Sequence, residues 1–85
     1  MAEIEIGKVT HYFGHINVAA VQIVSGTLTV GDTIHIKGHT SDVTTRVDSM
    51  QVNHVDVREA RVGDAVGLRV PAHVREHDQV FKVIP

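Results

Sequence analysis

The 85-residue chain contains no cysteine and no tryptophan, and its aromatic side chains are limited to one tyrosine and two phenylalanines. The absence of cysteine excludes disulfide frameworks and thiolate metal sites. No stretch approaches the ~20 apolar residues that cross a bilayer. The first residues also lack the basic segment and apolar run of a secretory signal. We therefore expect a cytoplasmic protein with no membrane partner.

Charge of neither sign dominates the sequence. Eight Lys and Arg stand against ten Asp and Glu, which gives a net charge of −2 with neutral histidines. Nucleic-acid-binding domains commonly show a basic excess, so the composition alone does not indicate such a partner. Seven histidines are enough to reverse the sign of the net charge when they are protonated. At 42% hydrophobic and 21% charged residues, the chain fits one folded domain spanning residues 1–85.

Short stretches rich in Val, Ile and Thr alternate with turns that contain glycine or aspartate, which is typical of an all-β domain. Gly31-Asp32 and Gly63-Asp64 occupy matching places in two similar segments. Glycine accepts a positive φ and aspartate bonds its own backbone, so we interpret both as turns of one kind. Six or seven strands without a long helix predict a small closed barrel, which removes exposed sheet edges. The strands are expected within residues 3–13, 17–24, 27–30, 33–37, 42–53, 64–70 and 79–84.

Two local irregularities are predicted in the middle of the chain. The alternation of apolar residues changes parity between Val47 and Met50, and a strand needs an extra residue for such a change. We expect a β-bulge near Asp48-Ser49. The spacing of Asp56 and Glu59 is that of a helix capping box, which predicts a single helical turn there.

The sequence offers little catalytic chemistry. None of the three serines lies in a Gly-x-Ser-x-Gly turn, and no cysteine replaces them as a nucleophile. Histidines four residues apart would share a metal on a helix. On a strand they lie ~13 Å apart, too far for one ion to bridge. We expect no enzyme, no metal and no cofactor, with a histidine-dependent metal site as a minor alternative. The three pairs are His11/His15, His35/His39 and His73/His77.

Three segments, taken in order, resemble domain 2 of the translational GTPases of the elongation factor Tu group. They are residues 26–38, residues 49–54 and residues 59–68. The resemblance extends over nearly the whole chain, from Ile6 to Val83. It implies a six-stranded antiparallel Greek-key barrel. The phosphate-binding Gly-x-x-x-x-Gly-Lys-Ser/Thr loop of the GTPases is absent from this sequence, so no GTP site is expected.

The resemblance also implies a binding surface, because this barrel receives the aminoacylated acceptor end in tRNA-carrying relatives. The matching surface comprises residues 14–17, residues 50–54 and residues 67–69. Gln51 stands where many relatives have an acid, and the first turn is less basic than theirs. From the residues themselves, Arg69 is expected to point outward from mid-strand. Tyr12 and Phe13, beside Gly14, are expected to offer a stacking platform for a base, with at least one of the three aromatic residues in the core. The candidate binding residues are Tyr12, His15, Gln51, Asn53, His54 and Arg69.

Two functions remain open. One is a non-catalytic, translation-related module that contacts tRNA or ribosomal RNA through these six residues. The other is a protein-interaction module that docks on a separate partner or on a second copy of itself. The near-neutral net charge favours the second function, whereas the resemblance favours the first.

Overall fold

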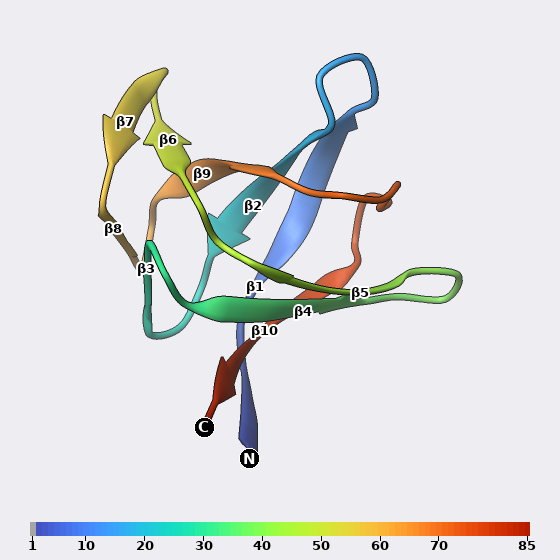
Figure 1. The fold of residues 1–85 in the computed structure, drawn as a ribbon, viewed down its shortest axis with the longest axis horizontal. Helices are drawn as coiled ribbons and strands as arrows, with labels where there is room; N and C mark the ends of the chain where they lie inside the picture. The colour runs from blue at the N-terminus through green and yellow to red at the C-terminus, as the bar shows by residue number, and fades with distance from the viewer. Residues whose placement is uncertain (1) are drawn as a thin grey trace.

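The computed structural model describes residues 2–85, which form ten β-strands and no helix (Figure 1). This confirms the predicted all-β class. Within this range there is accordingly no helix that is long and apolar enough to cross a membrane. The strands are β1 Ala2–Phe13, β2 Val18–Ile23, β3 Thr27–Thr29, β4 Thr33–Lys37, β5 Asp42–Arg46, β6 Met50–Val52, β7 Val55–Val57, β8 Glu59–Arg61, β9 Ala65–Arg69 and β10 Gln79–Ile84.

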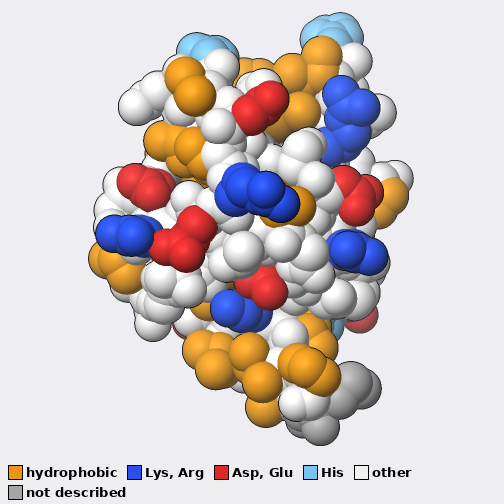
Figure 2. Space-filling view, turned by 60° about the vertical axis from the view of Figure 1, so that its left-hand side comes forward, with side chains coloured by type: hydrophobic (Ala, Val, Ile, Leu, Met, Phe, Trp, Pro, Cys, Tyr) orange, Lys and Arg blue, Asp and Glu red, His pale blue; other side chains and the backbone are white. Residues whose placement is uncertain are grey.

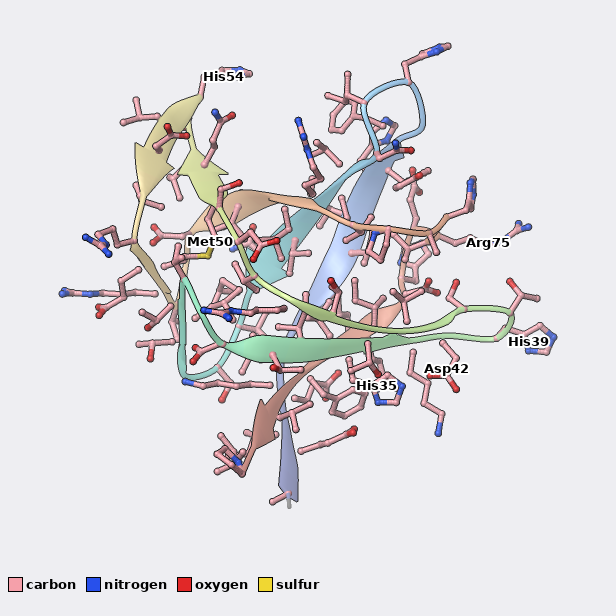
Figure 3. All side chains as sticks on the ribbon, viewed as in Figure 1. His35, His39, Asp42, Met50, His54 and Arg75 are labelled. Atoms are coloured by element: carbon pink, nitrogen blue, oxygen red, sulfur yellow. The ribbon has the colours of Figure 1, made fainter. Side chains whose placement is uncertain are left out.

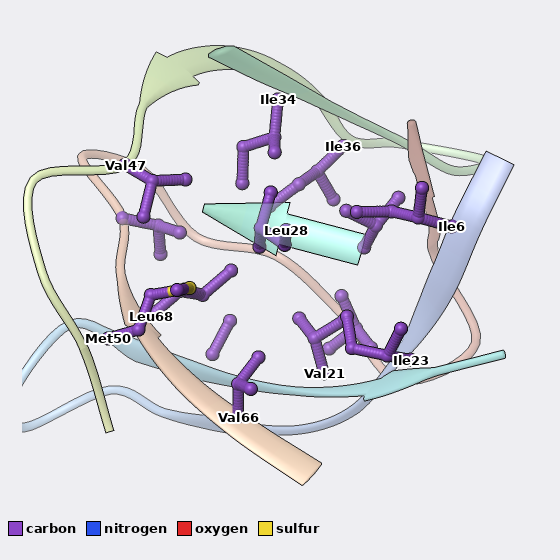
Figure 4. Close-up of a cluster of buried hydrophobic side chains, with 14 of the residues drawn as sticks. Ile6, Val21, Ile23, Leu28, Ile34, Ile36, Val47, Met50, Val66 and Leu68 are labelled. Atoms are coloured by element: carbon purple, nitrogen blue, oxygen red, sulfur yellow. The ribbon is translucent and has the colours of Figure 1, made fainter. Parts of the chain in front are cut away.

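Eight of the strands form one antiparallel sheet in the order β5-β4-β10-β1-β2-β9-β6-β7, and β3 pairs separately with β8. The strands surround the buried side chains, as the close-up in Figure 4 shows. Over residues 2–85 no ladder joins the edge strands β5 and β7. Antiparallel pairing is thus confirmed, whereas closure into a six-stranded barrel is not.

Alternating residues of most strands supply the core. In β2 and β4 every second residue is buried, and in β9 Val66 and Leu68 are each 1% exposed. Burying an Ile, Leu or Val side chain contributes about 1.5–3 kcal/mol, so these rows dominate stability. The buried apolar residues are Ile6, Val9, Ala19, Val21, Ile23, Leu28, Ile34, Ile36, Val47, Met50, Ala60, Val66, Leu68, Val70, Val74 and Val80.

Strand β1 contains two bulges, one toward each neighbouring strand. Its register against β10 shifts between Glu5 and Gly7, and its register against β2 shifts between Val9 and His11. At Gly7 the two backbones nearly touch, since a Cβ built there would lie 2.3 Å from the carbonyl oxygen of Gln22. Bulges bend and twist a strand. They allow β1 to curve around the core while pairing on both sides.

Three turns share one hydrogen-bond pattern. The side chains of Asp32, Asp64 and Asp78 each accept a bond of 2.9 Å from the backbone N–H three residues earlier. The residue before each aspartate has a positive φ, which is 101° at Gly31 and 96° at Gly63. The predicted equivalence of the two Gly-Asp turns is confirmed. In the third turn His77, at φ 74°, occupies the glycine position.

The structure contains neither the β-bulge predicted near Asp48-Ser49 nor the helical turn predicted at Asp56 within residues 2–85. The expected single strand over residues 42–53 is wrong: β5 ends at Arg46 and β6 begins at Met50, and the two pair with different neighbours. The parity change therefore marks a transfer between parts of the sheet, not a bulge. The helical turn predicted at Asp56 is also wrong. That residue lies in β7 opposite Gln51, whose Nε2 donates to its carboxylate at 3.0 Å.

A histidine and two carboxylates link three strands on the outer face of the sheet. The His35 ring of β4 lies between Glu3 of β1, with Nδ1 to Oε1 at 3.0 Å, and Asp42 of β5, which contacts Nε2. Figure 3 shows His35 beside Asp42. Hydrogen bonds to Glu3 and then to Asp42 raise the pKa of His35 above its ordinary value of 6.5. The imidazolium donates to both acids.

The close approach at Gly7 predicts that Gly7→Ala lowers the free energy of unfolding by about 1–3 kcal/mol, as overpacking of a rigid contact does. Gly67→Ala is the matched strand control, because its Cβ would lie 3.5 Å from Val18, in ordinary contact. Urea unfolding measures both variants. Equal stability of the two would contradict this role for Gly7.

The His35 contacts predict that stability depends on pH above neutrality. A pKa that is raised in the folded state stabilises fully below the unfolded value of about 6.5, and this contribution is lost as pH rises through the folded pKa. The melting temperature of the native chain should therefore fall more between slightly acidic and alkaline pH than that of His35→Gln. His39→Gln, four residues along the same hairpin, should keep the native dependence.

Candidate functional site

Five of the six predicted binding residues line two adjoining hollows at one end of the molecule. The larger hollow, about 690 Å³, contains His15 and Arg69. The smaller, about 360 Å³, contains Gln51, Asn53 and His54, and is called the apolar groove below. The β1–β2 loop of residues 14–17 borders both. The structure therefore brings together three segments that are far apart in the sequence.

The turn between β6 and β7 has only two residues, and both adopt left-handed backbone conformations. Asn53 has φ 53° and His54 has φ 64°. This geometry matches a type I′ turn, whose twist suits a two-residue hairpin. Glycine is preferred at the second position of such turns, so His54 holds a strained conformation. Its side chain extends from the tip of the hairpin (Figure 3).

The apolar groove runs over the outer face of β2 and β9. Ala20 and Gly67 are paired residues of these strands and leave its floor low. Phe13 and Ile16 stand beside it, with 46% and 58% of their surface exposed. Figure 2 shows hydrophobic side chains gathered at this end, between histidines. Amides of the β6–β7 hairpin complete the lining, although the Gln51 amide is bonded to Asp56.

The larger hollow carries mixed charge. Arg69 lines it from β9, and its guanidinium forms no ion pair within the described range 2–85. Asp48 lies in the same hollow and offsets part of this charge. Arg46 also borders it, but its Nη2 extends to 3.9 Å from the position of a Cβ on Gly31. Arg46 and Arg69 are thus the two arginines that border this hollow.

Tyr12, unlike the other five predicted residues, lines neither hollow. Its ring packs against the core and against His73, with centroids 4.5 Å apart, and its hydroxyl donates to Asn17 Oδ1 at 3.3 Å. The exposed aromatic ring at the site is that of Phe13. Phe13 was predicted, with Tyr12, to offer a stacking platform, and Ile16 lies in the predicted surface segment of residues 14–17, although neither was among the six candidate residues.

The site shows no assembled catalytic group. Ser49 and His15 line the larger hollow, but no hydrogen bond joins them in the part of the chain that the structure describes. An activated serine requires such a contact with a base. Nor do any three His, Asp or Glu side chains among residues 2–85 form a group that could hold a metal ion. The site offers hydrogen bonding, apolar contact and the guanidinium groups of Arg46 and Arg69.

Comparison with known proteins agrees with this fold. The sequence pattern of the family described as "Elongation factor Tu domain 2" matches residues 17–77. The chain belongs to the elongation factor Tu domain 2 family. The structure of GDP-bound aIF5B of Aeropyrum pernix superposes on this chain with a TM-score of 0.67 at 19% identity. The match covers 96% of this chain and 15% of the factor.

Relatives with similar sequences are named as proteases. An uncharacterized protease of Methanocaldococcus jannaschii is 41% identical over 93% of the chain, and a collagenase of Porphyromonas gingivalis is 32% identical over 94%. The chain spans about a fifth of the length of these relatives (19% and 20%). A solved C-terminal domain of a Geobacillus thermoleovorans protein assigned to the U32 peptidases superposes at TM-score 0.86 and 18% identity, covering 93% of this chain and 91% of that domain.

The strained hairpin tip predicts that His54→Gly raises the free energy of unfolding by about 0.5–1 kcal/mol, because glycine adopts a positive φ without steric cost. Val55→Gly, one residue further along in β7, should instead lower it, since glycine weakens a strand. Thermal unfolding measures both variants. A loss of stability in His54→Gly would show that the side chain contributes contacts that outweigh the strain.

Proposed function

We propose that this chain is a non-catalytic module that contacts an unpaired segment of RNA through the two adjoining hollows. The observation that carries the proposal is their combined lining. An exposed aromatic ring, side-chain amides and a guanidinium without an ion-pair partner among residues 2–85 lie on neighbouring strands. Single-stranded RNA is recognised by such groups, through stacking, base-edge hydrogen bonds and phosphate contacts. We further propose that the curved sheet corresponds to the six-stranded barrel of the family. We also propose that the protein is cytoplasmic.

The parts of the site have distinct roles in this proposal. Phe13 and Ile16 contact the face of a base over the low floor of the apolar groove. Asn53 offers an amide to its edge. Arg69 and His15, in the larger hollow, contact the adjoining phosphate, where a guanidinium forms charge-assisted bonds. The family supports this assignment, because its translational members work on tRNA and the ribosome.

A second function is favoured by a different observation. The groove is lined largely by apolar groups, and relatives that share this domain are named as proteases. In this alternative the module is an accessory domain of a protease, and the groove holds an extended polypeptide. Such a ligand would need Phe13 and Ile16 but not Arg69.

The RNA proposal predicts that Arg69→Gln weakens binding of a short unstructured RNA about tenfold, as the loss of one charged hydrogen bond does. The slope of log affinity against log salt should fall by about 0.7, the value for one phosphate on a single strand. Fluorescence anisotropy at several salt concentrations measures both quantities.

Arg61→Gln is the matched control, because Arg61 is exposed and already paired with Glu59 at 3.0 Å. It should leave the affinity unchanged. No binding of RNA by the native chain at low salt would reject the RNA proposal. Binding of unfolded polypeptide that survives Arg69→Gln but is lost in Phe13→Ser would support the protease-accessory alternative in its place.

A further inference from the structure

A third hollow, distant from the two at the candidate site, is lined by basic side chains. It measures about 540 Å³ and is bordered by Lys8 of β1, Lys37 of β4, His39 of the β4–β5 turn and His77 of the β9–β10 loop. Phe81 and Gln79 of β10 form its base. In Figure 3 His39 lies at the side of the molecule away from His54. We name this surface the basic hollow.

The sheet register explains why these groups converge. Lys8 pairs with Gln79, and Gln79 pairs with Lys37, so the three residues stand in one row across β1, β10 and β4. Neighbouring strands are ~4.8 Å apart, which places the two lysine backbones about 10 Å from each other. Side chains of this length can meet over the glutamine between them. Both lysines are exposed, and neither forms an ion pair within residues 2–85.

Carboxylates near the basic hollow are bound to other groups. Glu5 accepts a bond from Gln79 Nε2 at 3.1 Å, and Asp42 contacts His35. Asp78 is buried and accepts from the backbone of Arg75. No acidic side chain is among the lining residues. The hollow therefore presents basic groups to a ligand despite the net negative charge of the chain.

His77 gives an independent indication. It occupies the positive-φ position that glycine fills in the two equivalent turns at Gly31 and Gly63. A side chain there is disfavoured, and such strain is concentrated at functional sites. The imidazole of His77 lies at the edge of the basic hollow. Glycine would suit the turn better, so the presence of a side chain at this position points to a role in binding.

We propose that the basic hollow binds a nucleoside phosphate unit. Lys8 and Lys37 hold the phosphate, with His39 and His77 as further donors, and the ring of Phe81 contacts the base. A phosphate beside an aromatic ring is the pairing that nucleotide-binding surfaces use. The unit is supplied either by an RNA strand or by a free nucleotide. This inference is independent of the RNA site proposed above, because no lining residue is shared.

The test is a titration of the chain, observed by amide NMR, with uridine monophosphate, inorganic phosphate and a short RNA. Uridine monophosphate or RNA should shift the resonances of Lys8, Lys37, His39 and His77 saturably. A response to RNA alone identifies a strand as the source, and a response to the mononucleotide alone identifies a free nucleotide. The double variant Lys8→Gln/Lys37→Gln should bind at least about tenfold more weakly, since two charged contacts are lost.

Two further variants separate binding from folding. His77→Gly should weaken nucleotide binding while its melting temperature stays the same or rises. Arg69→Gln should bind the mononucleotide as the native chain does. The test of the basic hollow therefore stays valid even if the RNA site proposed above binds nothing. The inference is overturned by the absence of shifts at the hollow, by unchanged affinity in the double lysine variant, or by equal shifts from inorganic phosphate or a polyglutamate peptide.

Discussion

The close contact between β1 and β2 at Gly7 is the constraint on which the rest of the structure depends. β1 pairs with β10 on one side and β2 on the other, so it must curve in step with both. The absence of a Cβ at Gly7 allows the Gln22 carbonyl to approach. The resulting curvature turns the outer faces of β2 and β10 in different directions. One face then carries the apolar groove and the other the basic hollow.

Repetition of one turn fixes the ends of the strands at three places. In each turn an aspartate side chain accepts a hydrogen bond from the backbone N–H three residues earlier, which stabilises the reversal. The turns at Gly31-Asp32 and Gly63-Asp64 were predictable, because a Gly-Asp pair indicates a turn with a positive φ. The third turn was not predictable, because histidine, unlike glycine, does not indicate the positive φ that His77 adopts.

The alternation of apolar residues was sufficient to predict most of the strands and their buried faces, since Ile34, Ile36, Val66 and Leu68 occupy the alternate positions that are buried. Which strands pair with one another could not be predicted from this alternation. The capping-box spacing at Asp56 indicates a helix only if the backbone lacks other partners, and β6 supplies them. The candidate site was predictable through the family resemblance. The basic hollow was not, because its residues come from β1, β4, β10, a turn and a loop.

Net charge is a poor guide to the ligands of so small a domain. The eight Lys and Arg are outnumbered by acids, yet several acids are engaged in turns or in contact with His35. These carboxylates act on the fold, whereas Lys8, Lys37 and Arg69 remain directed to solvent. Screening in salt solution limits exposed charges to a range of about 8–10 Å, so a ligand responds to the local group and not to the total. A chain of slightly negative charge can therefore present two separate surfaces to phosphate.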